Sequence, residues 1–481
     1  MSGIALVLAV CAFQLWIAPD NPPGFFRDEA ALAYNAYTIE HDGRDEYGAR
    51  FPLYFSSFLD YKSPIFVYAL APVFLVTGPH REVARALGAA SVLAALLLLG
   101  WLGYRRSGRP LVGVATFVVG GTTPWLFELG RMALEVTMLP LFLCLVLLAV
   151  ERAARLDRWH VWTALPVALA LGGLTYVYAG GRLLAPLLAA GLLVLVNRAR
   201  WRWVATAAVG FVLTQIPLLV YRELHPGALS RRWDATTFIT PDMSPFEVAW
   251  RTVVNYLQDL ELWHYVDSGD VKPYAHTPGT SALLAASAAL AVTGVVIAVR
   301  RLRGDPFWRF ALVALVVSPL PAALTADRYH AIRLTPLAVM LVVFAIPAID
   351  SIGRNAVIAV AVAAAGLVQF GLFVHDWDVN GPSRTTRFEA DIPPLLRQGW
   401  ANGGTVYVDF DDHEPLTLAR WYALVEGLAQ TRVVRLPDGG IPPTGATAFG
   451  RTQECDYQCT RLAQSQSGDY WIARAEGPKA P

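Results

Sequence analysis

The sequence predicts an all-α polytopic membrane protein with about eleven transmembrane helices and a small α/β domain at its C-terminal end. Three observations predict this fold class. The chain of 481 residues is 55% hydrophobic and only 16% charged, whereas a soluble domain carries roughly 25% charged residues. Apolar stretches recur from the N-terminus to about Phe373. The composition then becomes polar, which indicates a separate domain outside the membrane.

The predicted spans are apolar runs, since a bilayer core about 30 Å thick needs roughly 20 apolar residues per helix. The runs are Gly3–Ala18, Val83–Gly103, Leu111–Leu126, Thr137–Val150, Val161–Tyr178, Leu183–Val196, Val204–Tyr221, Leu283–Val299, Phe310–Leu324, Leu334–Ile349 and Ala356–Val374. No basic segment precedes the first run, so we interpret it as a retained anchor and not as a cleaved signal peptide. A further run, Ile65–Thr77, follows Pro64, contains Pro72 and is short for a span, so we expect it to be juxtamembrane.

The charges in the loops predict the orientation of the chain. Loops that begin at Tyr104, Glu151, Asn197, Arg300 and Asp350 are rich in arginine, whereas the loop Pro19–Lys62 is rich in acidic residues. Because cytoplasmic loops carry the excess of basic residues, the N-terminus is expected inside and the acidic loop outside. Residues 1–374 then form the membrane domain, with an outer loop at 19–64 and a juxtamembrane segment at 65–78, and residues 375–481 form an extracytoplasmic α/β domain.

Secondary-structure signals support the α/β interpretation of the tail. Strand patterns occur at Gly404–Phe410, Arg432–Leu436 and Tyr470–Ala473. Asp411 and Asp412 are suited to cap a helix that runs through Tyr422. The acidic cluster of the tail is therefore interpreted as strand-end and capping residues and not as a metal site; it comprises Asp409, Asp411, Asp412, His413 and Glu414.

Net charge and cysteines narrow the possible partners. The formal net charge of +1 gives no reason to expect nucleic acid. The spacing of the four cysteines does not fit a zinc site. If the tail is extracytoplasmic, Cys455 and Cys459 are suited to form a disulfide, and two free thiols are the open alternative.

Polar residues beside the predicted spans gather on the outer side, and charges at a membrane boundary are costly unless they are paired or functional. Transfer of a sugar from a lipid-linked phosphate needs a carboxylate that takes the acceptor's proton and a cation that stabilises the leaving phosphate. The candidate catalytic residues are Asp28, Glu29 and Glu135. The candidate substrate-binding residues are Lys62, Tyr61, Arg131, Tyr178, Arg182, His330 and Arg333.

Most of these candidates also have a structural interpretation. Asp28 is also suited to cap a helix Glu29–Ile39, and Arg131 and Glu135 are spaced to pair with each other at i, i+4. Lys62 could extend its ammonium to the membrane interface, and Arg182 could contact lipid headgroups. His330 fits a hydrogen-bonded position at the membrane boundary. Taken one at a time, the residues leave these alternatives open.

The joint arrangement of the motifs resembles the GT-C class of membrane glycosyltransferases. It is similar to the family of dolichyl-phosphate-mannose protein mannosyltransferases and lipid A aminoarabinose transferases. In that family an Asp-Glu pair follows the first span, a Gly-Asp stretch comes next, and a Lys before proline opens an apolar segment. The matching residues here are Asp28-Glu29, Gly43-Arg44-Asp45, Lys62-Ser63-Pro64, the run Phe74–Ala90, and Gly130–Glu135 in a later outer loop.

The resemblance implies a role for several of these residues. Asp28 would be the general base, Lys62 a ligand of the carrier phosphate and Glu135 a second acid. Arg182 matches the family less closely but lies where the family places a cation for the phosphate, and His330 and Arg333 lie in a comparable outer loop. The motifs cover roughly the first 220 residues. The family often has two prolines after the lysine, where this chain has Ser63-Pro64, and the sugar-binding insertion of eukaryotic protein mannosyltransferases is absent, so protein O-mannosylation is not implied.

The sequence therefore predicts an inverting glycosyltransferase, of hexosyl or pentosyl type, that uses a polyprenyl-phosphate sugar at the outer face of the membrane. A lipid, glycan or protein is expected as acceptor, and membrane lipids surround the spans. Asp28, Glu29 and Glu135 are also suited to hold a divalent metal ion, an alternative to neutralisation of the phosphate by lysine and arginine. A transporter or flippase of a lipid-linked glycan, and an inactive scaffold whose outer domain binds a partner, are the competing interpretations.

Overall fold

The structure is a computed structural model, and it describes residues 2–16, 18, 20–58, 60–270, 272–401, 404–408, 413–437, 440–451, 455 and 457–478. The side chains of Ser2 and His413 are outside this description. Residues Asp409, Asp411 and Asp412, which we expected to end a strand and cap a helix, lie outside the described residues.

The chain forms two compact units. The first, called the helical unit here, comprises Met1–Ile17, Ser63–Ile65 and Ala86–Asn380. The second, called the mixed unit, comprises Ala18–Lys62, Phe66–Arg85 and Gly381–Pro481. The mixed unit thus combines the first long loop with the C-terminal end of the chain. The division into a membrane domain of residues 1–374 and a domain of residues 375–481 stays a prediction.

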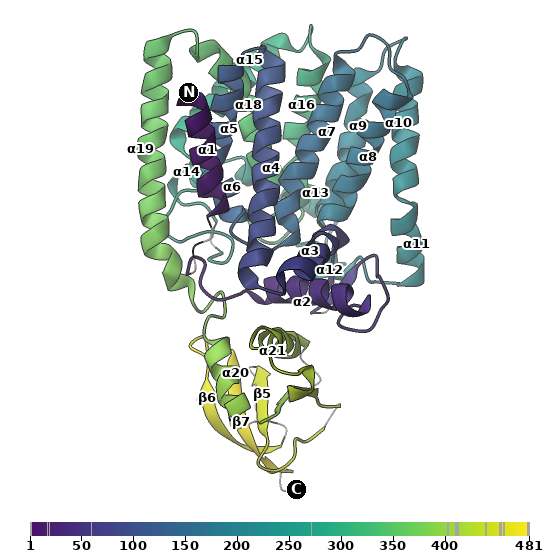
Figure 1. The fold of residues 1–481 in the computed structure, drawn as a ribbon. Coiled ribbons are helices and arrows are strands. Elements are labelled where there is room, and N and C mark those ends of the chain that lie inside the picture. Colours follow the sequence, from purple (N-terminus) through teal and green to yellow (C-terminus); the bar gives the residue numbers. More distant parts are fainter. Residues whose placement is uncertain are drawn as a thin grey trace. The chain divides into compact units, whose positions relative to one another are not determined.

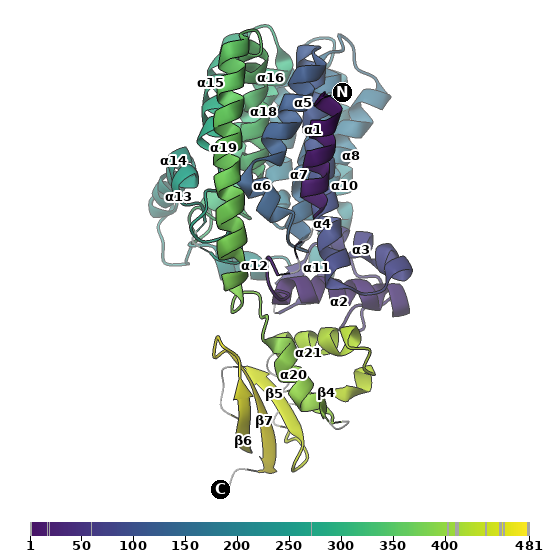
Figure 2. The ribbon, with the colours of Figure 1, turned by 60° about the vertical axis from the view of Figure 1, so that its left-hand side comes forward.

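The helical unit contains long helices that lie side by side, with shorter helical segments between them (Figures 1 and 2). In chain order they are α1 (Ser2–Leu15), α4 (Arg81–Ser107), α5 (Pro110–Gly121), α6 (Pro124–Leu129), η1 (Glu135–Met138), α7 (Leu139–Ala154), α8 (Val161–Val177), α9 (Gly181–Gly191), η2 (Leu192–Leu195), α10 (Trp201–Thr214), α11 (Ile216–Leu224), α12 (Arg231–Thr236), α13 (Pro245–Asp259), α14 (Leu262–Asp267), α15 (Ala285–Arg301), α16 (Pro306–Val317), α17 (Leu320–Ala323), α18 (Thr335–Ile352) and α19 (Ala356–Asn380). Each predicted span coincides with one of these helices or with two consecutive ones.

Within the part of the chain that the structure describes, six helical segments are long and apolar enough to cross a membrane. They are Arg81–Ser107, Glu135–Ala154, Trp201–Leu224, Pro306–Ala323, Thr335–Ile352 and Ala356–Arg384. The remaining apolar helices of the unit are shorter than 18 residues, so the count of about eleven spans is not confirmed. Thr122 and Thr123 divide the run Leu111–Leu126 into α5 and α6, because Pro124 favours the first position of a new helix.

Helix α18 lies at the centre of the helical unit, and α19 lies at its periphery. The side chains of α18 are buried from Thr335 to Asp350, as expected for a helix that is apolar on all faces. By contrast, Phe373 and Trp377 are the buried residues of α19, so most of its apolar surface is available to lipid. Gly294 of α15 lets the helices α15 and α18 approach closely, since a Cβ at this position would fall 1.5 Å from the carbonyl oxygen of Phe344.

The run Ile65–Thr77 forms helix α3, Pro64–Thr77, of 14 residues. At a rise of 1.5 Å per residue it is about 21 Å long. A hydrocarbon core of about 30 Å is longer than this helix, which agrees with the juxtamembrane interpretation.

In the mixed unit, a five-stranded sheet is formed by the C-terminal end of the chain. Its strands are β3 (Val406–Val408), β4 (Val433–Arg435), β5 (Thr447–Arg451), β6 (Gln458–Gln464) and β7 (Tyr470–Gly477), in the order β4-β3-β5-β7-β6. Strand β3 is parallel to β4 and β5, and β7 is antiparallel to β5 and β6. The helical elements of this part are η3 (Gly381–Arg384), α20 (Ile392–Trp400), α21 (His413–Val425) and η5 (Gln430–Arg432). The predicted α/β character of the tail is confirmed.

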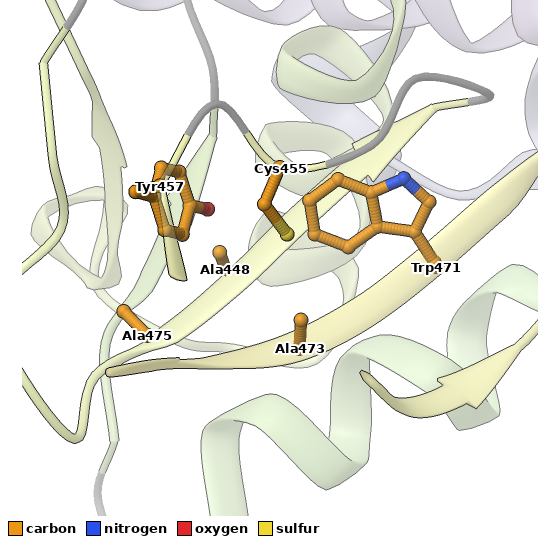
Figure 3. Close-up of a cluster of buried hydrophobic side chains, with 6 residues drawn as sticks. All are labelled: Ala448, Cys455, Tyr457, Trp471, Ala473 and Ala475. Carbon is orange, nitrogen blue, oxygen red and sulfur yellow. The ribbon is translucent and has the colours of Figure 1, made fainter. Parts of the chain in front are cut away.

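Cys455 and Cys459 form a disulfide, which resolves the alternative left open by the sequence. Figure 3 shows Cys455 with Tyr457 and Trp471 beside three small residues of the sheet, Ala448, Ala473 and Ala475. Small side chains on the strands leave room for the two aromatic rings above them. The disulfide therefore ties the segment before β6 to the hydrophobic core of the sheet.

Candidate active site

Helix α2 (Arg27–Asp42) carries the predicted acid pair of the first loop. Alanine and other strong helix formers fill its middle, and Asp28 and Glu29 lie in its first turn, where acidic groups complement the helix dipole. The interpretation of Asp28 as the helix cap is wrong, because the helix begins at Arg27 and Phe26 occupies the cap position. Glu29 Oε2 instead accepts the Phe26 N–H at 3.0 Å, which leaves the Asp28 carboxylate for another contact.

The Asp28 carboxylate meets the Lys62 ammonium in the mixed unit. Strands β1 (Phe55–Ser57) and β2 (Asp60–Lys62) pair as an antiparallel hairpin, and residues two apart on a strand point to the same side. Asp60 and Lys62 therefore share one face of β2. Lys62 Nζ lies 3.2 Å from Asp28 Oδ1 and 3.6 Å from Asp60 Oδ2.

The two side chains of this ion pair differ in their exposure to solvent. The side chain of Lys62 is 9% exposed, and that of Asp28 is 27% exposed. A strong interaction is expected because the lysine is largely removed from water. Of the two side chains, the Asp28 carboxylate is therefore the more accessible from outside the unit.

Glu29 is enclosed in an ion pair of its own. Arg85 donates to Glu29 Oε1 at 2.9 Å and to Glu29 Oε2 at 2.8 Å, and both side chains are nearly inaccessible to solvent. Arg85 also donates to the carbonyl oxygens of Pro22 and Gly24, at 2.8 and 3.0 Å. This bidentate pair fixes the loop before α2, and removal of one partner from such a buried pair costs about 3–5 kcal/mol.

The Gly-Asp stretch of the first loop forms the turn after α2. Gly43 ends the helix in the left-handed conformation, with φ +65°, as glycine commonly does. The Asp45 carboxylate accepts the N–H groups of Tyr47 and Ala49, at 3.0 and 2.7 Å, and burial raises the pKa of Asp45. Asp45 therefore organises this turn and belongs to its scaffold.

Half-buried Glu46 connects the same turn to α21. Its side chain accepts hydrogen bonds from Asn35 at 3.0 Å and from Thr417 at 2.7 Å. Burial raises the pKa of Glu46 to about 7, although these hydrogen bonds act in the opposite direction. Helix α2 packs against α21 in this unit, so Glu46 is one polar contact within a larger interface.

Glu135 and Arg131 belong to the helical unit, and each has its own partners. Glu135 is buried at the start of η1 and accepts the N–H of Ser63, the residue that follows Lys62 in the chain. Arg131 donates to the carbonyl oxygens of Gln14, in the last turn of α1, and of Trp16, just after it. Cations near the C-terminus of a helix are favourable, so Arg131 holds that end of α1.

A second polar group of the helical unit surrounds Tyr274. His330 Nε2 lies 3.1 Å from the Tyr274 hydroxyl, and His330 Nδ1 lies 3.2 Å from Asp270. Burial raises the pKa of Tyr274 to about 12, and Asp270, Arg333, Asp327 and Tyr178 are the charged or titratable neighbours that act on it. The structure thus places three candidates, Tyr178, His330 and Arg333, in one neighbourhood. His330 is hydrogen-bonded there, as its structural interpretation expects.

Further contacts are made by Arg333 and by the two remaining candidates, Arg182 and Tyr61. Arg333 donates to Thr325 at 2.8 Å and forms an ion pair with Asp327 at 3.1 Å, and Arg182, at the start of α9, donates to the Leu229 carbonyl at 3.3 Å. Tyr61 is half-buried on β2, and its N–H donates to the Asp60 carboxylate at 2.7 Å. In the mixed unit, the structure brings Asp28 and Lys62 together and leaves Glu29 paired with Arg85.

Asp60 and Arg85 were not singled out from the sequence. Asp60 lies two residues before Lys62 in a short strand pattern, and this spacing is the signal that places both on one face. Arg85 gave no signal, because its partner Glu29 is 56 residues away. Among the residues that the structure describes, no group of three or more His, Cys, Asp and Glu side chains is arranged to hold a metal ion.

Comparisons with known proteins agree with this architecture. The fold is that of the GT-C class of membrane glycosyltransferases, as the resemblance predicted. ArnT from Cupriavidus metallidurans is similar in the apo state, with a TM-score of 0.62 and 15% identity over 98% of this chain and 96% of that chain. The same protein bound to undecaprenyl phosphate gives a TM-score of 0.58 and 14% identity over 98% and 97% of the two chains.

An oligosaccharyltransferase from Archaeoglobus fulgidus is similar as well. Its TM-score is 0.54 at 11% identity, over 91% of this chain and 64% of that chain. No family model matches the sequence, and no curated protein matches it. At these identities the likeness establishes the fold, and the chemistry rests on the residues of this chain.

Proposed function

We propose that this protein is an inverting glycosyltransferase that moves a sugar from a polyprenyl-phosphate donor to an acceptor hydroxyl at the outer face of the membrane. The observation that carries the proposal is the Asp28–Lys62 pair, with 3.2 Å between its charged atoms. It unites the carboxylate and the cation that this transfer needs. Similarity of fold to ArnT, which binds undecaprenyl phosphate, supports the class of donor.

The reaction is a single displacement. The Asp28 carboxylate takes the proton of the acceptor hydroxyl, and the acceptor oxygen forms a bond to the anomeric carbon of the sugar. The bond between that carbon and the phosphate oxygen breaks, and the electron pair stays on the phosphate. One displacement at the anomeric carbon inverts its configuration.

Lys62 stabilises the leaving phosphate. Its ammonium has three hydrogens, so it can keep a contact with Asp28 and donate to a phosphate oxygen at the same time. Burial of the lysine strengthens its attraction to the negative charge that develops as the carbon–oxygen bond breaks. Lys62 thus acts on both reacting groups, the base and the leaving group.

The other candidates have supporting parts in this mechanism. We assign Glu29 to positioning, because both of its oxygens are engaged by Arg85. Glu135 holds the backbone N–H of the residue after Lys62. Arg182, Tyr178, His330 and Arg333 stay candidates for contacts with the phosphate or the sugar. We assign the part of the cation beside Asp28 to the Lys62 ammonium, which already lies next to this carboxylate, and not to a divalent metal ion.

The charge pattern supports an outer location of the site. The loop that contains Asp28 and Lys62 is acidic, whereas the arginine-rich loops lie on the other side of the predicted spans. The sugar, hexose or pentose, and the acceptor, whether lipid, glycan or protein, are open. A flippase of a lipid-linked glycan is the alternative, and transport in proteoliposomes without any sugar transfer would favour it.

Substitution of Asp28 by asparagine tests the proposed base. Purified full-length protein is supplied with undecaprenyl phosphate that carries mannose, arabinose or aminoarabinose, and with membrane extract as the source of acceptor. We expect Asp28→Asn to lower turnover about 100-fold to 10,000-fold, the usual contribution of a general base. Asp42→Asn is the matched control, because Asp42 is exposed at the other end of the same helix. Undiminished turnover in a folded Asp28→Asn protein rules out Asp28 as base.

A further inference from the structure

Arg27, the first residue of α2, is held by acidic residues from the C-terminal end of the chain. Its guanidinium donates to Glu414 at the start of α21, and its Nε lies 3.7 Å from Glu389 Oε1. The two glutamate side chains are only 6% and 7% exposed. Arg27 and Glu414 are 387 residues apart in the chain, so local helix propensity does not account for this contact.

Tyr470 of strand β7 connects the two glutamates. Its hydroxyl lies 3.1 Å from Glu389 Oε1 and also contacts Glu414 Oε1, but a phenol has only one hydrogen to donate. Glu414 additionally accepts from Arg451 at 2.9 Å, and two guanidinium groups stabilise its negative charge. The second contact of Tyr470 is satisfied if Glu389 carries a proton and donates it to the phenol oxygen.

The backbone at Glu389 is held in an uncommon conformation. Its φ is +53°, in the left-handed region that non-glycine residues seldom adopt. Such a residue costs on the order of 1–3 kcal/mol and persists only where its surroundings fix it. The carbonyl of Glu389 accepts the N–H of Ile392 at the start of α20, at 3.1 Å. The turn therefore directs the Glu389 side chain to the cluster at some cost to the fold.

We propose that Glu389, Glu414 and Tyr470 form an anchor for Arg27, and that this anchor positions Asp28 for proton transfer. The inference rests on the proposed function and gives the C-terminal end of the chain a part in the reaction. In this proposal these residues act on Asp28 through Arg27 and not on the substrate, so they are positioning residues. Because Arg27 begins α2, its displacement moves the first turn of the helix and Asp28 with it. A shift of about 1 Å in a reacting group can cost roughly 100-fold in rate.

The protonation of Glu389 bears on the same turn. The pKa of Glu389 is raised to about 8: burial raises it most, Arg27 and the hydrogen bond from Tyr470 lower it, and the negative charges of Glu414 and Asp28 raise it. The charged or titratable groups that face it are therefore Arg27, Glu414, Tyr470 and Asp28. While Glu389 is neutral, Arg27 is shared by fewer negative groups and stays with Glu414.

The test compares Arg27→Met with Arg27→Lys in the full-length protein, in the transfer assay with undecaprenyl-phosphate sugars. Arg397→Met is the matched control, because Arg397 forms an exposed ion pair with Glu426, at 2.6 Å, in the same unit. We expect Arg27→Met to lower kcat about 10-fold to 100-fold, with donor KM changed by less than about threefold. Arg27→Lys should recover most of the rate because it keeps the charge, and the control should match the wild type.

Amide hydrogen exchange of the first turn of α2 supplies a readout that does not depend on catalysis. The amides of Asp28 to Ala31 are expected to exchange faster in Arg27→Met than in the wild type. If Arg27→Met does not fold, Tyr470→Phe removes a single hydroxyl from the anchor, and kcat is expected to fall about 3-fold to 10-fold, the effect of one lost hydrogen bond.

Two outcomes overturn the anchor and are distinct from failure of the proposed function. Normal kcat in Arg27→Met and Tyr470→Phe, with Asp28→Asn inactive, shows that the anchor does not position the base. Unchanged exchange in the first turn of α2 shows that Arg27 does not hold the helix. Normal turnover in Asp28→Asn together with faster exchange in Arg27→Met shows instead that the proposed base is wrong, and the positioning role is then lost with it.

Discussion

At the scale of single residues, the ammonium group of Lys62 contacts two acidic neighbours at once. Asp28 and Asp60 lie 3.2 and 3.6 Å from its Nζ. The sequence allowed Asp28 and Lys62 to be proposed together because both occur in motifs. Asp60 was overlooked, since a carboxylate two residues before a lysine in a short strand is easily interpreted as surface charge.

Replacement of Lys62 tests its two expected effects, one on the stability of the fold and one on the binding of the leaving phosphate. Lys62→Met leaves Asp28 and Asp60 facing each other without a cation, and breaking a buried ion pair destabilises the fold by up to about 3–5 kcal/mol. We expect a lower melting temperature, a lower kcat and a higher donor KM, because the leaving phosphate loses its ligand. Lys62→Arg, which keeps the charge, is expected to recover stability more fully than turnover. A donor KM that is unchanged in Lys62→Met contradicts the role as phosphate ligand.

Glu389 gives the protein a predicted dependence on alkaline pH. The fold raises the pKa of this carboxyl from 4.5 to about 8. Between these two pH values the carboxyl is protonated in the folded state and ionised in the unfolded state. Ionisation is therefore opposed by the fold, and the contribution of Glu389 to stability falls as pH rises from about 4.5 through 8. Glu389→Gln keeps a neutral group at this position. Its melting temperature is expected to fall less than that of the wild type between pH 7 and pH 9.5, measured by thermal unfolding in detergent, and parallel curves contradict the assignment.

At the scale of elements, apolar runs predicted where helices occur, but they did not predict where those helices are interrupted. Every predicted span contains helix, because hydropathy is a sum over many residues and tolerates local error. The break between α5 and α6 lies at Pro124, and that between α16 and α17 lies at Pro319 and Pro321; a sum over many residues does not detect such local features. Helix α13 was not predicted, although Ser244 and Glu247 form a capping box at its start, the signal that was available.

The close approach of α15 and α18 makes a prediction about Gly294. A Cβ at this position would lie 1.5 Å from the Phe344 carbonyl oxygen, so the two backbones would have to separate. Gly294→Val is expected to destabilise the protein by more than about 3 kcal/mol, because the buried helix α18 cannot repack locally. Gly371→Val on the exposed α19 is the control, since a Cβ there meets no atom within 4 Å. Equal yield and melting temperature of the two variants, measured by size-exclusion chromatography and thermal unfolding in detergent, contradict the prediction.

At the scale of the whole molecule, the fold class and the class of architecture were predictable, and the grouping of distant segments was not. Composition and hydropathy are local properties, so they indicated a membrane protein with a polar tail. The contact of Arg27 with Glu414 joins positions 387 residues apart. No local pattern in either segment indicates that the two segments meet. The same reason explains why Asp28 and Lys62 were found from the motifs, whereas Arg85, Glu389 and Tyr470 became visible only in the structure.

The composition of the mixed unit also bears on how the protein is made. Its first segment ends at Lys62 and its last begins at Gly381, so a ribosome must add about 320 residues before the two can meet. At about 5–20 residues per second this interval is on the order of tens of seconds. During synthesis the first loop is therefore made long before its C-terminal partner, and a chain that stalls before Gly381 leaves it open to proteases. The mixed unit is the later of the two units to be completed.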